Sequence, residues 1–181
     1  MRVISGSLGG RRFNPPQLAN TRPTTDFGKT GLFNILNNHI DFEEVSFLDL
    51  FSGTGSISYE FASRGCKNIL AIDQDQQCVK FIQKMIQEWK LEGIEVIKGD
   101  VLKFIENTRQ KFDVIFAGPP YALSNIAEIP EIIFQRDLLN EEGWFILETD
   151  PRYDFSAHPS FARKTNYGQT TFHFFRKKAS S

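Results

Sequence analysis

The chain has 181 residues and an apolar fraction of 40%, which is enough for one compact domain with a short appendage. No run of about 18 apolar residues occurs, and no long apolar segment follows the first residues, so we expect neither a membrane span nor a signal peptide. Cys66 and Cys78, like the three histidines, lack the spacing of metal ligands. We therefore expect free thiols, a cytoplasmic location and no metal site.

The net charge of −1 conceals two basic ends. Residues 1–31 carry five basic side chains and one acidic side chain, and residues 152–181 carry six and one. The segment between them therefore has a net charge of −10. If the two ends lie close together in space, they form one positive face that attracts a polyanion such as a nucleic acid. The alternative is that both ends are solvated tails.

Residues 1–25 are rich in Gly, Pro, Arg and Thr, with little apolar periodicity. This composition predicts one or two short strands followed by an extended arm. Thr25 or Asp26 has a side-chain oxygen that can cap a helix, and the apolar residues that follow recur at helical spacing, which predicts a helix over 26–39. We expect residues 1–25 to form a basic extension and 26–181 to form the main domain.

From residue 45 onward, short apolar runs alternate with segments of helical periodicity. This alternation predicts βαβ units, and therefore a mainly parallel sheet with helices on both faces. The last two runs flank a Tyr-Gly-Gln turn, which predicts an antiparallel hairpin at the sheet edge. The sequence thus predicts an α/β protein with seven strands. The expected strands are 45–51, 68–73, 94–97, 112–117, 144–147, 161–165 and 170–176, and the helices between them 56–64, 75–89, 101–108 and 126–138.

The strongest local motif is Asp-Leu-Phe-Ser-Gly-Thr-Gly at residues 49–55, where the first strand turns into a helix. Its glycines allow the backbone to approach a ligand, and the start of the helix offers free N–H groups. The third glycine of a dinucleotide fingerprint would fall at Ser58, so the motif is not a clean dinucleotide site. An acid before the glycines would repel a pyrophosphate but suits the ammonium and sulfonium groups of S-adenosyl-L-methionine. We expect this cofactor to contact Asp49, Phe51, Gly53 and Gly55.

Two further acidic residues lie at the ends of the next two strands, since Asp73 ends the second strand and Asp100 comes after the third. The carboxyl ends of parallel strands meet at one edge of the sheet, where ligands of α/β proteins bind. We expect Asp73, beside Gln74, to accept hydrogen bonds from both ribose hydroxyls. Asp100 is expected to accept one from the adenine amine, with the Val101 N–H as a donor. Each acid alone also fits a cap at a strand end, but three at successive strand ends indicate a nucleoside-bearing cofactor.

Gly118, Pro119, Pro120 and Tyr121 follow the fourth strand directly. Consecutive prolines make the backbone rigid and orient its carbonyl groups. The exocyclic amine of a base is a poor nucleophile, and acceptors on its N–H bonds position it and stabilise the charge of the transition state. Tyr121 can stack on a base that has left its helix. These four residues form the expected catalytic loop. The alternative is a proline turn with a surface tyrosine.

Together these motifs resemble the N-methyltransferases of bases, whose catalytic motif reads Asp/Asn-Pro-Pro-Tyr. Further segments that carry a resemblance are 2–6, 10–12, 21–24, 32–36 and 167–168. They narrow the resemblance to the RsmD family, which methylates N2 of a guanine in bacterial 16S ribosomal RNA during small-subunit maturation. The resemblance implies a Rossmann-like class I methyltransferase fold, S-adenosylmethionine as cofactor, and 16S rRNA within a small subunit or its precursor as partner.

The basic residues of the N-terminal region are the expected RNA contacts, which would give affinity with little sequence reading. Phe27 stands where the family usually has Arg, and Thr30 where it usually has Glu. These two changes alter the basic segment that would dock RNA. The expected phosphate contacts are Arg11, Arg12, Arg22 and Lys29.

Gly118 stands where the family has Asp or Asn. The substitution removes a side-chain acceptor and leaves the backbone carbonyls near Pro119 to orient the amine. Two alternatives therefore remain open. One is another amine methyltransferase, acting on adenine N6 in DNA or on protein glutamine, since those enzymes use similar Pro-Pro-Tyr loops. The other is a non-catalytic module that binds S-adenosylmethionine and RNA.

Overall fold

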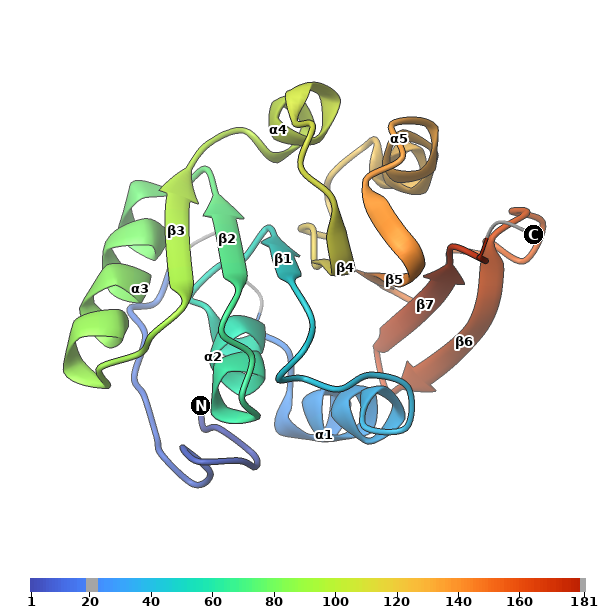
Figure 1. The fold of residues 1–181 in the computed structure, drawn as a ribbon. Coiled ribbons are helices and arrows are strands. Elements are labelled where there is room, and N and C mark those ends of the chain that lie inside the picture. The colour runs from blue at the N-terminus through green and yellow to red at the C-terminus, as the bar shows by residue number, and fades with distance from the viewer. Residues whose placement is uncertain (19–22, 180–181) are drawn as a thin grey trace.

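The computed structural model describes residues 1–18 and 23–179. Within them it shows one seven-stranded sheet in the order β3-β2-β1-β4-β5-β7-β6 (Figure 1). Strands β1 to β5 are parallel, and β7 is antiparallel to both β5 and β6. The predicted α/β architecture with a closing antiparallel hairpin is confirmed. The strands are β1 (Phe47–Leu50), β2 (Ile69–Asp73), β3 (Ile94–Lys98), β4 (Phe112–Ala117), β5 (Leu139–Thr149), β6 (Phe161–Tyr167) and β7 (Thr170–Arg176).

Helices cover both faces of the sheet (Figure 1). Helices α4 and α5 lie over one face, and α1, α2 and α3 over the other. None of the helices in the described ranges is long and apolar enough to cross a membrane. The helices are α1 (Asp26–Leu36), α2 (Ser56–Ser63), α3 (Gln76–Glu88), α4 (Val101–Asn107) and α5 (Ile129–Gln135), with a 3-10 turn η1 (Ile126–Glu128) before α5.

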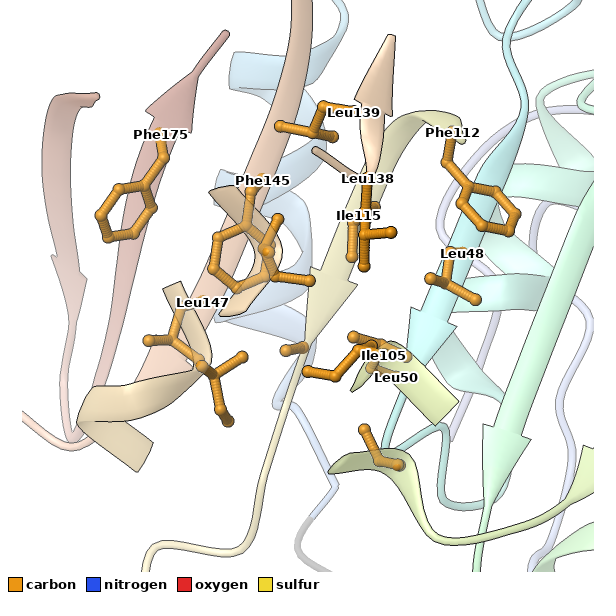
Figure 2. Packing of buried hydrophobic residues seen from close by; sticks show 14 of the residues in the cluster. Leu48, Leu50, Ile105, Phe112, Ile115, Leu138, Leu139, Phe145, Leu147 and Phe175 are labelled. Atoms are coloured by element: carbon orange, nitrogen blue, oxygen red, sulfur yellow. The ribbon is translucent and has the colours of Figure 1, made fainter. Parts of the chain in front are cut away.

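The core under α4 and α5 is made of aliphatic and aromatic side chains from the central strands (Figure 2). Leu48, Ile115 and Phe145 come from three neighbouring strands and are fully buried. The opposite face is more aromatic, and the Phe47 and Phe61 rings stack there with centroids 3.6 Å apart. Burial of this kind is the dominant favourable contribution to folding. It fixes the strand ends relative to one another, and so the loops that follow them.

The N-terminal residues pack onto the body of the protein. Val3 and Phe13 are buried, and the Phe13 ring meets the Tyr59 ring of α2 edge-to-face at 5.2 Å. An isolated antiparallel bridge joins Arg2 to Arg12 and closes the loop between them. The predicted short strands are therefore present only as this single bridge, and no named strand forms in the described residues before β1. Backbone bonds flank the bridge, from the Val3 N–H to the Arg11 carbonyl at 2.9 Å and from the Phe13 N–H to the Met1 carbonyl at 3.0 Å.

Two predicted helices have different limits in the structure. The helix expected over 26–39 ends at Leu36, and its predicted cap is present, since the Thr25 hydroxyl accepts a hydrogen bond from the Gly28 N–H at 3.1 Å. The helix expected over 126–138 is divided into η1 and α5. Pro130 lies in the first turn of α5, where a missing N–H costs no helical hydrogen bond.

Candidate active site

The loop after β1 has the strained backbone that its glycines predict. Gly53 and Gly55 have φ of +55° and +94°, in the left-handed region that favours glycine. A Cβ at Gly55 would lie 2.6 Å from the Tyr59 ring, whereas a Cβ at Gly53 would meet nothing within 4 Å. Gly55 therefore allows close packing, and Gly53 leaves open space beside the loop. Phe51 also has a positive φ, of +58°, which is rare for a bulky residue and concentrates at functional sites.

Asp73, at the end of β2, is bonded to this loop. Its Oδ2 accepts a hydrogen bond from the Gly53 N–H at 2.8 Å, and its Oδ1 accepts one from the Asp75 N–H at 2.9 Å. Partial burial raises the pKa of this carboxyl above its usual range. Each carboxylate oxygen has a second lone pair, so both can still accept from a ligand. Asp73 thus orients the glycine loop and keeps acceptor capacity at the carboxyl edge of the sheet.

Asp49 lies beneath the loop and not on its surface. The side chain is 1% exposed, and its Oδ2 accepts a hydrogen bond from the Ser58 hydroxyl at 2.6 Å. Burial is the largest cause that raises the Asp49 pKa to about 7, and the charges of Asp73 and Glu148 add to it. Ser58, the position where a dinucleotide site would have glycine, therefore holds the buried acid. A cation bound above the loop would favour the charged form of Asp49.

The remaining predicted cofactor residues lie along the same edge. The backbone connects the ends of β2 and β3, because the Gly99 N–H donates to the Asp73 carbonyl at 3.0 Å. Asp100 is exposed and caps α4, where it accepts a hydrogen bond from the Lys103 N–H at 3.1 Å. Gln74 is also exposed, whereas Val101 is buried in the first turn of α4. Their contacts with a cofactor stay predictions.

The Pro-Pro-Tyr loop adjoins the glycine loop. The Gly118 N–H donates to the Leu50 carbonyl, which precedes the glycine loop, at 3.2 Å. Among the described residues, no hydrogen-bond donor contacts the carbonyls of Gly118 and Pro119, whereas the Pro120 carbonyl accepts from the Leu123 N–H. The Tyr121 hydroxyl donates to the Gln169 carbonyl at 3.3 Å, which ties this loop to the turn of the C-terminal hairpin. The loop that adjoins the glycine loop therefore has two carbonyls that are not engaged by donors from the described residues.

The sequence interpretation did not include Glu148. This acid lies near the end of β5 and is 1% exposed. Because Ala117, the last residue of β4, pairs with Leu147, Glu148 comes one residue after that pair, as Gly118 does on the neighbouring segment. Its Oε1 accepts a hydrogen bond from the Thr24 hydroxyl at 2.8 Å. An acid near the end of the fifth strand repeats the pattern of Asp49, Asp73 and Asp100, and that pattern is the signal that would have found it.

Two buried hydroxyl groups at the glycine loop fit a site that takes a polar ligand. Within residues 1–18 and 23–179, Ser52 Oγ and Tyr59 OH have no hydrogen-bond partner. Buried polar groups usually have one, so an unpaired group calls for an explanation. Ser52 belongs to the loop, and the Tyr59 ring lies against Gly55. Together with the space beside Gly53, these atoms are consistent with a bound nucleoside cofactor.

The four predicted RNA contacts have different environments. Arg11 and Arg12 are exposed, and the Arg11 guanidinium lies 5.8 Å from the centre of the Trp89 ring at the end of α3. Arg22 lies outside the described residues. Lys29 is 1% exposed, and its Nζ donates to the Arg2 carbonyl at 2.5 Å and to Ser56 Oγ at 3.1 Å. The prediction that Lys29 contacts RNA is wrong, because this ammonium is enclosed by protein acceptors.

The cysteines are free, as predicted, and both are buried. Across the described part of the chain, no three His, Cys, Asp or Glu side chains are grouped as metal ligands would be. His173 is fully buried in β7, where its Nε2 lies 2.8 Å from the Thr149 hydroxyl. Burial lowers the His173 pKa to about 4, so the ring is neutral at pH 7.

Known proteins resemble the chain over nearly its whole length. The ribosomal RNA small subunit methyltransferase D of Escherichia coli K12 is 24% identical over 182 residues, 99% of this chain and 91% of that relative. The solved structure of yhhF from Escherichia coli, provisionally named a methyltransferase, has a TM-score of 0.86 at 24% identity and covers 99% of both chains. RsmC of Thermus thermophilus, a 16S rRNA N2 guanine methyltransferase solved with S-adenosylmethionine and guanosine, has a TM-score of 0.68 at 19% identity, over 86% of this chain and 44% of that one.

These likenesses show a Rossmann-like class I methyltransferase fold. A family model described as "Conserved hypothetical protein 95" matches residues 1–176. Relatives that carry the small subunit methyltransferase D name agree with that match. The chain belongs to this family, the RsmD family.

Proposed function

We propose that this protein is an S-adenosylmethionine-dependent methyltransferase that acts on the N2 amine of a guanine in 16S rRNA. The observation that carries the proposal is the 3.2 Å hydrogen bond from the Gly118 N–H to the Leu50 carbonyl. It holds the Pro-Pro-Tyr loop beside the glycine loop, so an amine and a methyl donor can bind next to each other. The names of the E. coli relative and of RsmC support rRNA as the substrate class.

The residues at the ends of β1, β2 and β3 are suited to hold the cofactor. Asp73 accepts from ribose hydroxyls, while Asp49 stabilises positive charge from beneath the loop, and Asp100 lies at the next strand end. Phe51, Gly53 and Gly55 shape the loop so that backbone approaches the ligand closely. When bound, S-adenosylmethionine supplies the methyl group that is transferred.

The Pro-Pro-Tyr loop is suited to hold the base. The carbonyls of Gly118 and Pro119 accept the two N–H bonds of an exocyclic amine, which fixes its direction of approach. These carbonyls also stabilise the positive charge that develops on the nitrogen. Tyr121 stacks on the base, and its hydroxyl bond to the Gln169 carbonyl keeps the ring in place. Transfer would be direct and would need no protein nucleophile, because the amine nitrogen would bond the methyl carbon as the carbon–sulfur bond breaks, and the methylated nitrogen would then release one proton to water.

The experiment is transfer of labelled methyl from S-adenosylmethionine to four substrates: immature small subunits, free 16S rRNA, DNA and protein. Label in the small subunit or its free RNA, at the N2 position of one guanine after nuclease digestion and mass analysis, is the expected result. Label only at adenine N6 in DNA, or only at protein glutamine, would overturn the rRNA assignment. A Gly118→Asp variant is assayed in parallel.

A second candidate is a module that binds S-adenosylmethionine and RNA without turnover, and Gly118 is the observation that favours it. A Cβ at position 118 would lie 3.2 Å from Cε1 of Phe116, so an aspartate fits after a shift of a few tenths of an ångström. If the natural protein binds cofactor and RNA but transfers no methyl group, and Gly118→Asp does, the non-catalytic module is supported. Turnover by the natural protein rejects it.

A further inference from the structure

A groove of about 350 Å³ lies between α1 and β6, outside the candidate active site. We call it the α1–β6 groove. None of the residues that line it is acidic. Phe27 is 67% exposed and is the only exposed large hydrophobic side chain in the described part of the chain. Its lining includes Phe27, Asn34, Asn38, His39, Arg163 and Tyr167.

The aromatic wall of the groove is held in position by a glycine. A Cβ at Gly31 would lie 2.1 Å from Cζ of Tyr167, so the tyrosine ring rests directly on the backbone of α1. The Phe27 and Tyr167 rings meet edge-to-face, with centroids 5.3 Å apart and an interplanar angle of 85°. The contact orients Phe27 and leaves most of its surface in solvent. A fixed, exposed aromatic ring is a platform on which a planar group can stack.

The groove begins at the carboxyl edge of the sheet. Thr24, just before α1, bonds Glu148 near the end of β5, so the first turn of α1 lies at that edge. Tyr167 precedes the hairpin turn whose Gln169 carbonyl accepts from the Tyr121 hydroxyl. From there the groove follows α1 toward His39, whose ring lies 5.1 Å from Trp144. One end is therefore next to the loop assigned to the target base.

The chemistry of the lining suits a single-stranded nucleic acid. The exposed Arg163 supplies a cation with no carboxylate in the groove to neutralise it, and the amides of Asn34 and Asn38 can donate and accept at base edges. The volume is in the range of a small-ligand pocket. Helix α1 has 11 residues and is about 16 Å long, and stacked nucleotides rise about 3.4 Å each, so a strand lying along this helix would span about four to five nucleotides.

We propose that the α1–β6 groove binds the single-stranded RNA next to the target base, with one base stacked on Phe27 and a phosphate on Arg163. The proposal rests on the proposed function, because RNA is the substrate there. A protein of the small subunit is the rival occupant. Charge complementarity and continuity with the Tyr121 loop favour RNA.

The test measures binding of a fluorescent ten-nucleotide single-stranded RNA by anisotropy. Phe27→Ala is expected to weaken binding about five- to tenfold, and Phe27→Tyr to leave it nearly unchanged. Arg163→Ala is expected to lower the slope of log K against log salt by about 0.7. Lys164→Ala is the matched control, because Lys164 is the next exposed cation on β6 and does not line the groove. The RNA affinity of Lys164→Ala should stay within about twofold of that of the natural protein.

In methyl transfer to rRNA, Phe27→Ala should raise KM about fivefold or more and leave kcat nearly unchanged. If Arg163→Ala and Lys164→Ala lose equal amounts of RNA affinity, the proposal is overturned, since the losses would show only a general effect of charge. If Phe27→Ala and Arg163→Ala keep their RNA affinity but no longer bind small-subunit particles, the RNA proposal is overturned in favour of a protein partner. Binding is measured without turnover, so absence of methyl transfer by the natural protein counts against the proposed function alone.

Discussion

The Lys29 ammonium lies 3.6 Å from the Glu60 carboxylate, and both side chains are almost completely buried between α1 and α2. Glu60 also accepts hydrogen bonds from the backbone N–H groups of Ile4 and Ser5, at 2.8 and 3.1 Å. Lys29 in turn donates to the Arg2 carbonyl. The pair therefore fastens the N-terminal residues to the body. Lys29 thus has a structural role, where the basic composition of this region had suggested an RNA contact.

Lys29→Ala is expected to destabilise the protein by about 3 kcal/mol, because it leaves the buried Glu60 without one of its two cations. Arg64, whose Nε lies 3.0 Å from Glu60, limits the loss. Urea denaturation measures the change. Lys84→Ala is the control, since Lys84 pairs with Glu88 on an exposed helix face and should change stability by less than about 0.5 kcal/mol. Equal effects of the two substitutions would show that Lys29 has no special role.

Asp49→Asn is expected to increase stability at pH 8 by on the order of 3 kcal/mol. Burial raises the Asp49 pKa to about 7, so the folded state holds this proton more tightly than the unfolded chain. The natural protein should therefore lose stability as pH rises from about 4 to 7, whereas the variant should not show that part of the loss. Urea denaturation at pH 5 and pH 8 measures the free energy of unfolding of both proteins. If the variant keeps the pH dependence of the natural protein, Asp49 is not the group that causes it.

The same carboxyl should couple cofactor binding to pH. A cation favours the charged form of Asp49, so affinity for S-adenosylmethionine should rise as pH increases through about 7. Calorimetric titration from pH 6 to pH 8 measures this dependence. Asp49→Asn should bind more weakly and with little pH dependence over that range. A steep dependence that persists in the variant would place the titrating group elsewhere.

Tyr121→Ala should reduce kcat/KM for the RNA substrate by roughly tenfold or more and leave S-adenosylmethionine affinity nearly intact, because the loss of stacking affects the base and not the cofactor. Tyr121→Phe keeps the ring and removes only the hydroxyl bond to Gln169. The kcat/KM of Tyr121→Phe should lie between those of the alanine variant and the natural protein. A large loss of cofactor affinity in Tyr121→Ala would contradict the assigned role.

Gly31→Ala tests how tightly Tyr167 is packed. The new methyl group would lie 2.1 Å from the ring, so the tyrosine must move, at a cost of about 1 to 3 kcal/mol. Thermal unfolding measures that cost. At Gly99 a Cβ would meet nothing within 4 Å, so Gly99→Ala should be nearly neutral. Comparable melting temperatures for the two variants would show that Tyr167 has room to adapt.

The candidate site was predictable where its signals are local in sequence. The positive φ angles of Gly53 and Gly55 follow from a glycine turn between strand and helix. Asp73 and Asp100 were expected at one edge because parallel strands end together, and Asp73 is indeed the last residue of β2, while Asp100 caps α4 just after β3. The register that places Glu148 beside Gly118 could not be read locally, since it depends on how β4 and β5 pair.

The sequence by itself determined the order of strands and helices, the glycine turn and the proline loop, because periodicity, glycine and proline act over a few neighbouring residues. Only the tertiary structure decided which charges are buried and which surfaces adjoin. Lys29 pairs with Glu60 because α1 packs on α2, and Phe27 lies at the rim of a groove because α1 also packs on β6. Such contacts join residues far apart in the chain, so no local pattern specifies them.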